Sequence, residues 1–139
     1  MTQGGIYHRA RAEQLLIWPE LRWGNIRPTD VDAFVDFRGD VFVWGEVKLR
    51  GKDVPQGQRI AMDNMRKVYA DAGRKYLFFI AEHNVPCGQD IRLEDTTVRR
   101  YCWHGGYWKD CEILTRDLLS RFVSRFAHLK LKEATDGQE

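Results

Sequence analysis

Residues 29–48 read TDVDAFVDFRGDVFVWGEVK, and this stretch decides the fold. It holds two runs rich in β-branched and aromatic residues, which favour strands. Between the runs stands Arg38-Gly39-Asp40. A short glycine-containing connection between two such runs predicts an antiparallel β-hairpin.

Charged residues meet across this predicted hairpin. With the turn centred on Gly39, Asp32 lies across from Glu46. Asp30 then lies across from Lys48. All four side chains point to one face, because strand residues two apart share a face. Opposed residues have Cβ atoms roughly 4.5 to 5.5 Å apart, so the two carboxylates repel and need an offsetting charge.

A divalent cation is the offsetting charge that this pattern favours, since magnesium is typically held by one or two carboxylates with waters and substrate phosphate. Lys48 adds a fixed positive charge beside it. Hydrolysis of a phosphodiester uses both a metal and a lysine. The metal activates water, while the lysine orients the nucleophile or offsets developing charge. The alternative interpretation is that Asp30, Asp32 and Asp36 are solvent-facing strand residues. Glu46 and Lys48 are then ordinary surface charges.

The runs DVDAFV (30–35) and VWGEVKLR (43–50) resemble the acidic motif and the Glu-x-Lys strand of the PD-(D/E)XK nuclease superfamily, whose fold is restriction-endonuclease-like. The layout is similar to small Holliday-junction resolvases and to compact nuclease-like proteins of phage genomes. The resemblance covers residues 7–81, and Thr29 stands where many members have proline. It implies a metal-dependent DNA endonuclease, with structure-selective cleavage as one form of that activity. The implied cofactor is Mg²⁺, with Mn²⁺ as its substitute.

The resemblance also implies roles for individual residues. Its catalytic set is Asp32, Glu46, Lys48 and Gln58. Its metal-contacting positions are Asp32, Glu46, Val47 and Glu13, with Asp30 as the alternative to Asp32 and Glu20 as the alternative to Glu13. Glu13, Glu20 and Gln58 are also typical of solvated helix positions.

The rest of the chain predicts a mixed α/β domain: a sheet built mostly from β-hairpins and flanked by helices, with an αβββαβ core and a C-terminal β/α addition. We expect one domain over 1–139, with its core at 7–81, the addition at 82–132 and a frayed tail at 133–139. The expected elements are a helix at 7–17, a strand at 21–26, the hairpin, a helix from Pro55 to Gly73, a strand at 76–81 buried on both faces, a strand at 98–103 paired with 107–108, and a helix at 114–131. The apolar stripe of the second helix is Ile60, Met65, Val68, Tyr69 and Ala72, and that of the last is Leu118, Phe122, Phe126 and Leu129.

Composition places the chain among ordinary folded proteins, with 43% hydrophobic and 30% charged residues. No apolar run approaches the roughly 18 residues of a membrane span, and residues 1–14 lack the apolar centre of a secretory signal. Three cysteines make a disulfide framework unexpected. We therefore expect the protein to lie in a reducing cytoplasm. The resemblance implies that this is the cytoplasm of a bacterium or of a phage-infected host cell.

A net charge of only +2 means that any contact with nucleic acid depends on local clusters. The expected contacts are Arg50, Arg59, Arg121 and Arg125, the last two on a stripe with His128 and Lys132. DNA is the expected partner, with RNA left open, and cutting both strands would favour a homodimer. The alternatives are a catalytically silent nucleic-acid-binding module and a phage or host protein-interaction protein, the latter binding through its aromatic-rich C-terminal half.

Two weaker patterns lie in that C-terminal half. Cys87, Cys102, His104 and Cys111 invite a zinc site but lack a Cys-x-x-Cys pair, so Cys102 is better explained as a buried strand residue. Trp103, Tyr107 and Trp108 could stack on unpaired bases, although packing in the core or in a dimer interface is the commoner use of such residues.

Overall fold

The computed structural model describes residues 20–131. The chain divides into two compact units, of which Val31–Leu131 contains the whole sheet and both helices described below. The expected helix at 7–17 and the tail at 133–139 lie outside the described residues. The strand expected at 21–26 was wrong: Trp23 and Ile26 pair only with each other, because Gly24 (φ 66°) turns the chain between them.

The hairpin formed as predicted. Strands β1 (Ala33–Phe37) and β2 (Val41–Leu49) are antiparallel, and their register runs from Ala33 opposite Gly45 to Phe37 opposite Val41. This register is centred on Gly39, whose φ of 74° suits a residue without a side chain.

Helix α2 (Gln56–Asp71) follows, between Pro55 and Gly73 as predicted. It crosses over to β3 (Lys75–His83), which lies parallel to β2. The predicted apolar stripe was partly wrong, because Ile60 (51%) and Val68 (56%) are exposed. The buried positions are Gln58 and Met62, with Met65 and Tyr69 packed beside them. A polar residue, Gln58, lies on the buried side of α2, so the positions of the apolar residues alone predicted the wrong buried side.

The C-terminal addition contains the 3-10 turn η1 (Leu93–Asp95), β4 (Thr97–Trp103), β5 (Lys109–Leu114), α3 (Thr115–Phe122) and the π-helical turn η2 (Val123–Ala127). The partner predicted for β4, residues 107–108, was wrong, because β4 pairs with β5, which begins at Lys109. Trp108 instead turns toward α2, where its Nε1 donates to Asp63 at 2.8 Å. The last helix is shorter than predicted, because His128 adopts a left-handed conformation (φ 57°) that ends it.

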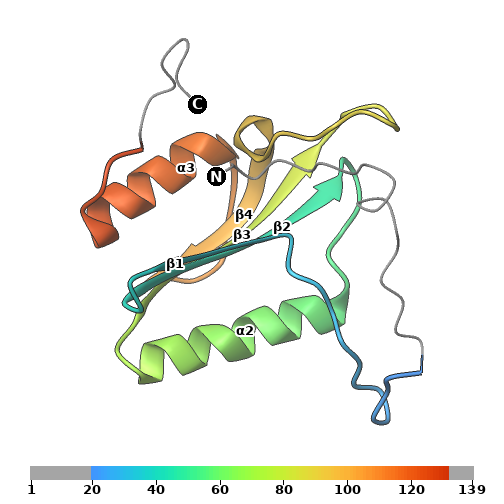
Figure 1. Cartoon of the computed structure of the whole chain (residues 1–139), viewed down its shortest axis with the longest axis horizontal. Helices are drawn as coiled ribbons and strands as arrows, with labels where there is room; N and C mark the ends of the chain where they lie inside the picture. The colour runs from blue at the N-terminus through green and yellow to red at the C-terminus, as the bar shows by residue number, and fades with distance from the viewer. Residues whose placement is uncertain (1–19, 132–139) are drawn as a thin grey trace, which may run out of the picture. The chain divides into compact units, whose positions relative to one another are not determined.

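The strands form a five-stranded mixed sheet in the order β1-β2-β3-β4-β5. Helix α2 covers one face and α3 covers the other (Figure 1). Each face has its own core, one containing Trp44, Met62 and Phe78 and the other containing Phe79 and Phe122. Residues 76–81 are therefore buried on both faces, as predicted, and the mixed α/β class is confirmed. No helix within residues 20–131 is long and apolar enough to cross a membrane.

Candidate active site

Glu46 is a fully buried carboxylate on β2, on the face covered by α2. Trp44, two residues earlier on the same face, donates its indole N–H to Glu46 Oε2 at 2.8 Å. Gln58, in the first turn of α2, donates Nε2 to Glu46 Oε1 at 3.1 Å. The backbone amide of Asp32 is a third donor. Donors from β2, from α2 and from the residue before β1 thus hold the carboxylate in one orientation.

The environment of Glu46 acts on its pKa in opposite directions. Burial is the largest effect and raises the pKa, because a charged carboxylate is poorly solvated inside the protein. The Trp44 hydrogen bond lowers it, the negative charge of Asp32 raises it, and the positive charge of Lys48 lowers it. The net pKa of Glu46 lies above its ordinary value. A cation at this position would favour the ionised form.

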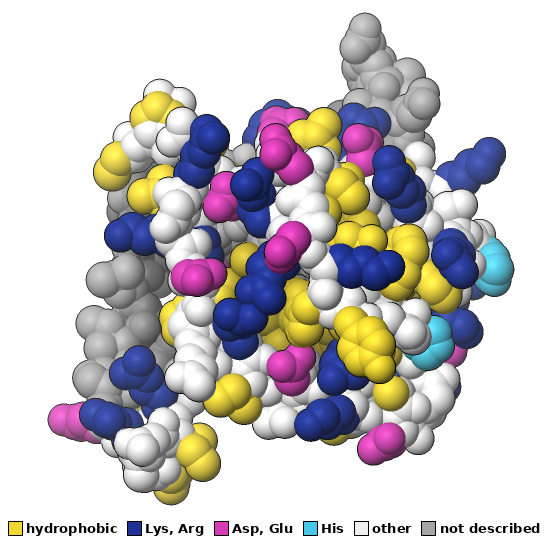
Figure 2. All heavy atoms as spheres, turned by 180° about the vertical axis from the view of Figure 1, so that it is seen from behind, with side chains coloured by type: hydrophobic (Ala, Val, Ile, Leu, Met, Phe, Trp, Pro, Cys, Tyr) yellow, Lys and Arg dark blue, Asp and Glu magenta, His cyan; other side chains and the backbone are white. Residues whose placement is uncertain are grey.

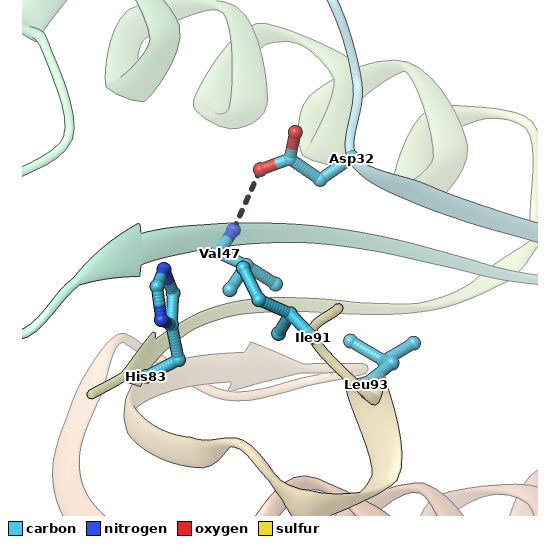
Figure 3. A pocket seen from close by; sticks show the side chains of 5 residues that line it. All are labelled: Asp32, Val47, His83, Ile91 and Leu93. Atoms are coloured by element: carbon cyan, nitrogen blue, oxygen red, sulfur yellow. Dashed lines mark hydrogen bonds between the residues drawn. The ribbon is translucent and has the colours of Figure 1, made fainter. Parts of the chain in front are cut away.

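Asp32 lies just before β1 and is exposed. Its Oδ2 accepts the backbone N–H of Val47 at 2.7 Å (Figure 3). The last β1–β2 pair is Ala33 with Gly45, so Asp32 bonds an N–H of β2 beyond the end of that ladder. This bond holds the Asp32 carboxylate beside Glu46, in agreement with the predicted register.

Lys48 is half-buried and points to the same face as Glu46. In the parallel pairing of β2 with β3 it lies next to Glu82. Glu82 in turn meets Arg99 on β4 at 3.7 Å, and Arg99 meets Glu112 on β5 at 3.3 Å. A row of charges therefore crosses the sheet away from the candidate site.

The donor set available to a metal consists of two carboxylates. Within residues 20–131, no group of three or more His, Cys, Asp or Glu side chains could hold a metal ion. Asp32 and Glu46 nevertheless suit magnesium, which uses one or two carboxylates and completes its shell with water and phosphate. Three donors occupy three of the four lone-pair sites of the Glu46 carboxylate, so one site remains for a cation.

The other predicted metal positions differ in where they lie. Glu13 is outside the described residues. Asp30 and Glu20 belong to the other compact unit. Asp36, which was predicted only as a solvent-facing strand residue, lies at the far end of β1, where it accepts the Gly39 N–H at 2.6 Å and supports the turn.

The four arginines predicted to contact nucleic acid fall into two groups. Arg50 follows β2, and Arg59 lies beside Gln58 on α2. Arg121 and Arg125 are on α3 and η2, on the opposite face of the sheet from Glu46. Arg125 stacks on the rings of Trp103 and Phe126, at 5.7 and 5.1 Å from their centroids. Lys132 lies outside the described residues. On the face shown in Figure 2, basic side chains alternate with acidic and apolar ones and form no continuous basic patch.

Two of the three cysteines and Trp103 take structural positions, whereas Cys87 and Tyr107 are exposed. Cys102 is buried in the core under α2, while Cys111 packs against the core under α3, so these thiols lie on opposite faces of the sheet. Trp103 packs against Phe122. Tyr107 is 87% exposed.

The structure adds partners that sequence reasoning missed. Trp44 could have been found, because it shares a strand face with Glu46 at a spacing of two. Glu82 carries no local signal, since its position beside Lys48 depends on the pairing of β2 with β3.

A pocket of about 260 Å³ adjoins Asp32 and was also missed; it is lined by Asp32, Val47, His83, Ile91 and Leu93. In Figure 3 the Asp32 carboxylate lies at the edge of β2. The other four side chains gather on one side of the strand: Val47, His83, Ile91 and Leu93.

Comparisons with models of protein families, with curated proteins and with solved structures found no match to this chain.

Proposed function

We propose that this protein is a magnesium-dependent nuclease that hydrolyses phosphodiester bonds in DNA. One observation carries the proposal: the buried Glu46 carboxylate is held beside Asp32, with Lys48 on the same face. A buried carboxylate near a second negative charge costs stability unless a cation offsets it. Such a pair is unexpected in a protein that only binds the polyanion DNA.

Each residue has a role in the proposed reaction. Asp32 and Glu46 would hold the cation, and the Val47 carbonyl would supply a third oxygen, because the N–H and C=O of one strand residue point to the same edge. The chemistry that Mg²⁺ would supply here is polarisation of the phosphoryl group and activation of a water molecule. Lys48 Nζ offsets the charge that develops on the phosphate. Gln58 and Trp44 are positioning residues, because they act on the substrate only through Glu46.

The arrangement of elements supports membership of the restriction-endonuclease-like fold. The order β1-β2-α2-β3, with β2 parallel to β3, matches the last four elements of the proposed αβββαβ core. Residues 20–131 contain no counterpart of the first helix and the first strand of that core. The C-terminal β4, β5 and α3 extend the sheet and cover its second face.

A panel of labelled DNA substrates tests the proposal: duplex, single-stranded and branched DNA, each with magnesium, with manganese and with chelator. We expect cleavage with either metal and none with chelator. Asp32→Asn and Glu46→Gln should each abolish cleavage while the circular dichroism spectrum stays that of the parent. Cleavage by both variants at the parent's rate would overturn the assignment. If both strands of a duplex are cut, we expect a homodimer in solution, since each chain supplies one site.

A further inference from the structure

We infer that the pocket beside Asp32 is a subsite for one unpaired nucleobase of the nucleic-acid substrate. The inference rests on the proposed function and extends it, because it names the part of the substrate that lies next to the cleaved phosphate. It also predicts the class of DNA that the protein prefers.

The pocket adjoins the candidate active site directly. Val47 contributes its side chain to the pocket and its N–H to Asp32. It also follows Glu46 in β2, so its side chain points to the face opposite Glu46. A nucleotide whose phosphate is at Asp32 can therefore place its base on the other side of the β2 edge. Figure 3 shows the two sides together.

The lining favours an uncharged, flat group over a phosphate. Val47, Ile91 and Leu93 supply apolar walls, and Asp32 supplies the only formal charge among the lining residues, apart from any proton on His83. A phosphate here would meet a negative charge with no Lys or Arg in the lining. The faces of a nucleobase are apolar, and packing them against aliphatic side chains removes both surfaces from water.

His83 supplies a polar contact for the edge of the base. Its Nδ1 accepts the backbone N–H of Val85 at 3.1 Å. In the neutral ring, Nε2 therefore carries the hydrogen and can donate it. Every nucleobase has an acceptor on its edge, so this contact selects bases in general and discriminates weakly among them.

A base can enter this pocket only when it is unpaired. Removing a base from a duplex costs a few kcal/mol, whereas a base in a single strand or at a junction is already available. We therefore expect cleavage to be faster on single-stranded or branched DNA than on an intact duplex.

Ile91 is the residue to change. It is 46% exposed, so Ile91→Ala removes a pocket wall with little effect on the core. Leu93 is less suitable, because it packs against the core under α3. Ile60→Ala is the matched control, since Ile60 is 51% exposed on α2 and does not line the pocket. His83→Ala removes the proposed donor.

The test compares binding of a labelled oligothymidylate with binding of an abasic strand of the same length and charge, in chelator. The parent and Ile60→Ala should bind oligothymidylate about fivefold or more tightly than the abasic strand, the scale of one buried base. In Ile91→Ala and His83→Ala this ratio should fall toward one, while affinity for the abasic strand stays unchanged.

The outcomes separate this inference from the proposed function. A parent that binds both strands equally overturns the subsite, even if it cleaves DNA. An equal fall of the ratio in Ile60→Ala also overturns it, because the effect would not belong to the pocket. A ratio that depends on Ile91 in a protein that cleaves nothing supports the subsite and overturns the nuclease proposal.

Discussion

At the scale of single residues, Glu46 is the unusual one. It is the only Asp, Glu, Lys or Arg among residues 20–131 whose side chain is fully buried. Burying a carboxylate costs free energy that hydrogen bonds and a nearby lysine offset only in part, so such a group adds little to stability. A requirement for a charge at a defined position explains its place better than folding does.

Lys48→Ala separates catalysis from binding. If Lys48 offsets charge at the reacting phosphate, single-turnover cleavage should slow by about 10²-fold or more. DNA affinity should fall only slightly, because one phosphate contact is a small part of the electrostatic footprint. Lys67→Ala, an exposed lysine on α2, is the control and should change neither. Equal and mild losses of rate and affinity in Lys48→Ala would make it an ordinary contact.

Asp32→Asn should lower the pKa of Glu46, because the negative charge of Asp32 raises it. The asparagine oxygen can still accept the Val47 N–H, so the hairpin should remain intact. The pKa can be followed by NMR titration of the Glu46 carboxyl carbon in metal-free buffer. Asp36→Asn, at the other end of β1, is the matched control and should leave the Glu46 pKa in place. An unchanged pKa in Asp32→Asn would mean that the carboxylates do not interact.

At the scale of elements, the site is built where the β1–β2 hairpin meets the first turn of α2. The hairpin brings Asp32 to Glu46, and α2 brings Gln58. The close packing of β2 on β3 holds this arrangement in place. Gly45, next to Glu46, lies against the ring of Phe79, and a Cβ at this position would be 2.1 Å from its Cζ.

Gly45→Ala should therefore destabilise the fold by about 1–3 kcal/mol, the usual cost of overpacking a core. Gly57→Ala makes the same substitution in α2, where a Cβ meets no atom within 4 Å. Alanine is the better helix former, so that variant should be neutral or more stable by up to about 1 kcal/mol. Urea unfolding of both variants measures the difference. Equal stabilities would show that Phe79 moves aside without cost.

At the scale of the whole molecule, two cores on opposite faces of one sheet support the site. A buried charge at the end of β2 is tolerated because the rest of the sheet is well packed on both sides. The stability of the metal-free protein should consequently depend on pH through Glu46.

The raised pKa of Glu46 sets the direction of this dependence. The folded protein binds the Glu46 proton more tightly than the unfolded chain does, so this contribution to the free energy of unfolding is full at low pH. It is lost as pH rises from the ordinary glutamate range through the raised pKa. Relative to Glu46→Gln, the parent should lose stability over this window in urea unfolding at a series of pH values. Parallel pH profiles for the two proteins would contradict it.

Magnesium should restore stability to the parent at neutral pH. A ligand at ten times its Kd that binds only the folded state adds about 1.4 kcal/mol. The rise in Tm on adding magnesium should be absent in Glu46→Gln and in Asp32→Asn. Sodium chloride at equal ionic strength controls for screening. An equal rise in all three proteins would place metal binding elsewhere.

The sequence alone determined the features that depend on near neighbours along the chain. The hairpin register follows from the alternation of β1 and β2 about Gly39, and it predicted that Asp32 meets Glu46. The limits of α2 follow from Pro55 and Gly73. The burial of β3 on both faces follows from its continuous apolar run. These patterns are local, so a single sequence carries them.

Only the tertiary structure decided how the site is completed. The side of α2 that faces the sheet depends on the hydrogen bond from Gln58 to Glu46. A search for regularly spaced apolar residues does not detect this polar contact. The position of Glu82 beside Lys48 and the pocket formed by Ile91 and Leu93 arise from pairing and packing across the sheet. The pairing of β4 with β5 is another such case. Trp108 donates a hydrogen bond to Asp63 on α2 and does not pair with β4. In each case the deciding contact joins residues far apart in the chain, and its free energy outweighs the local preference.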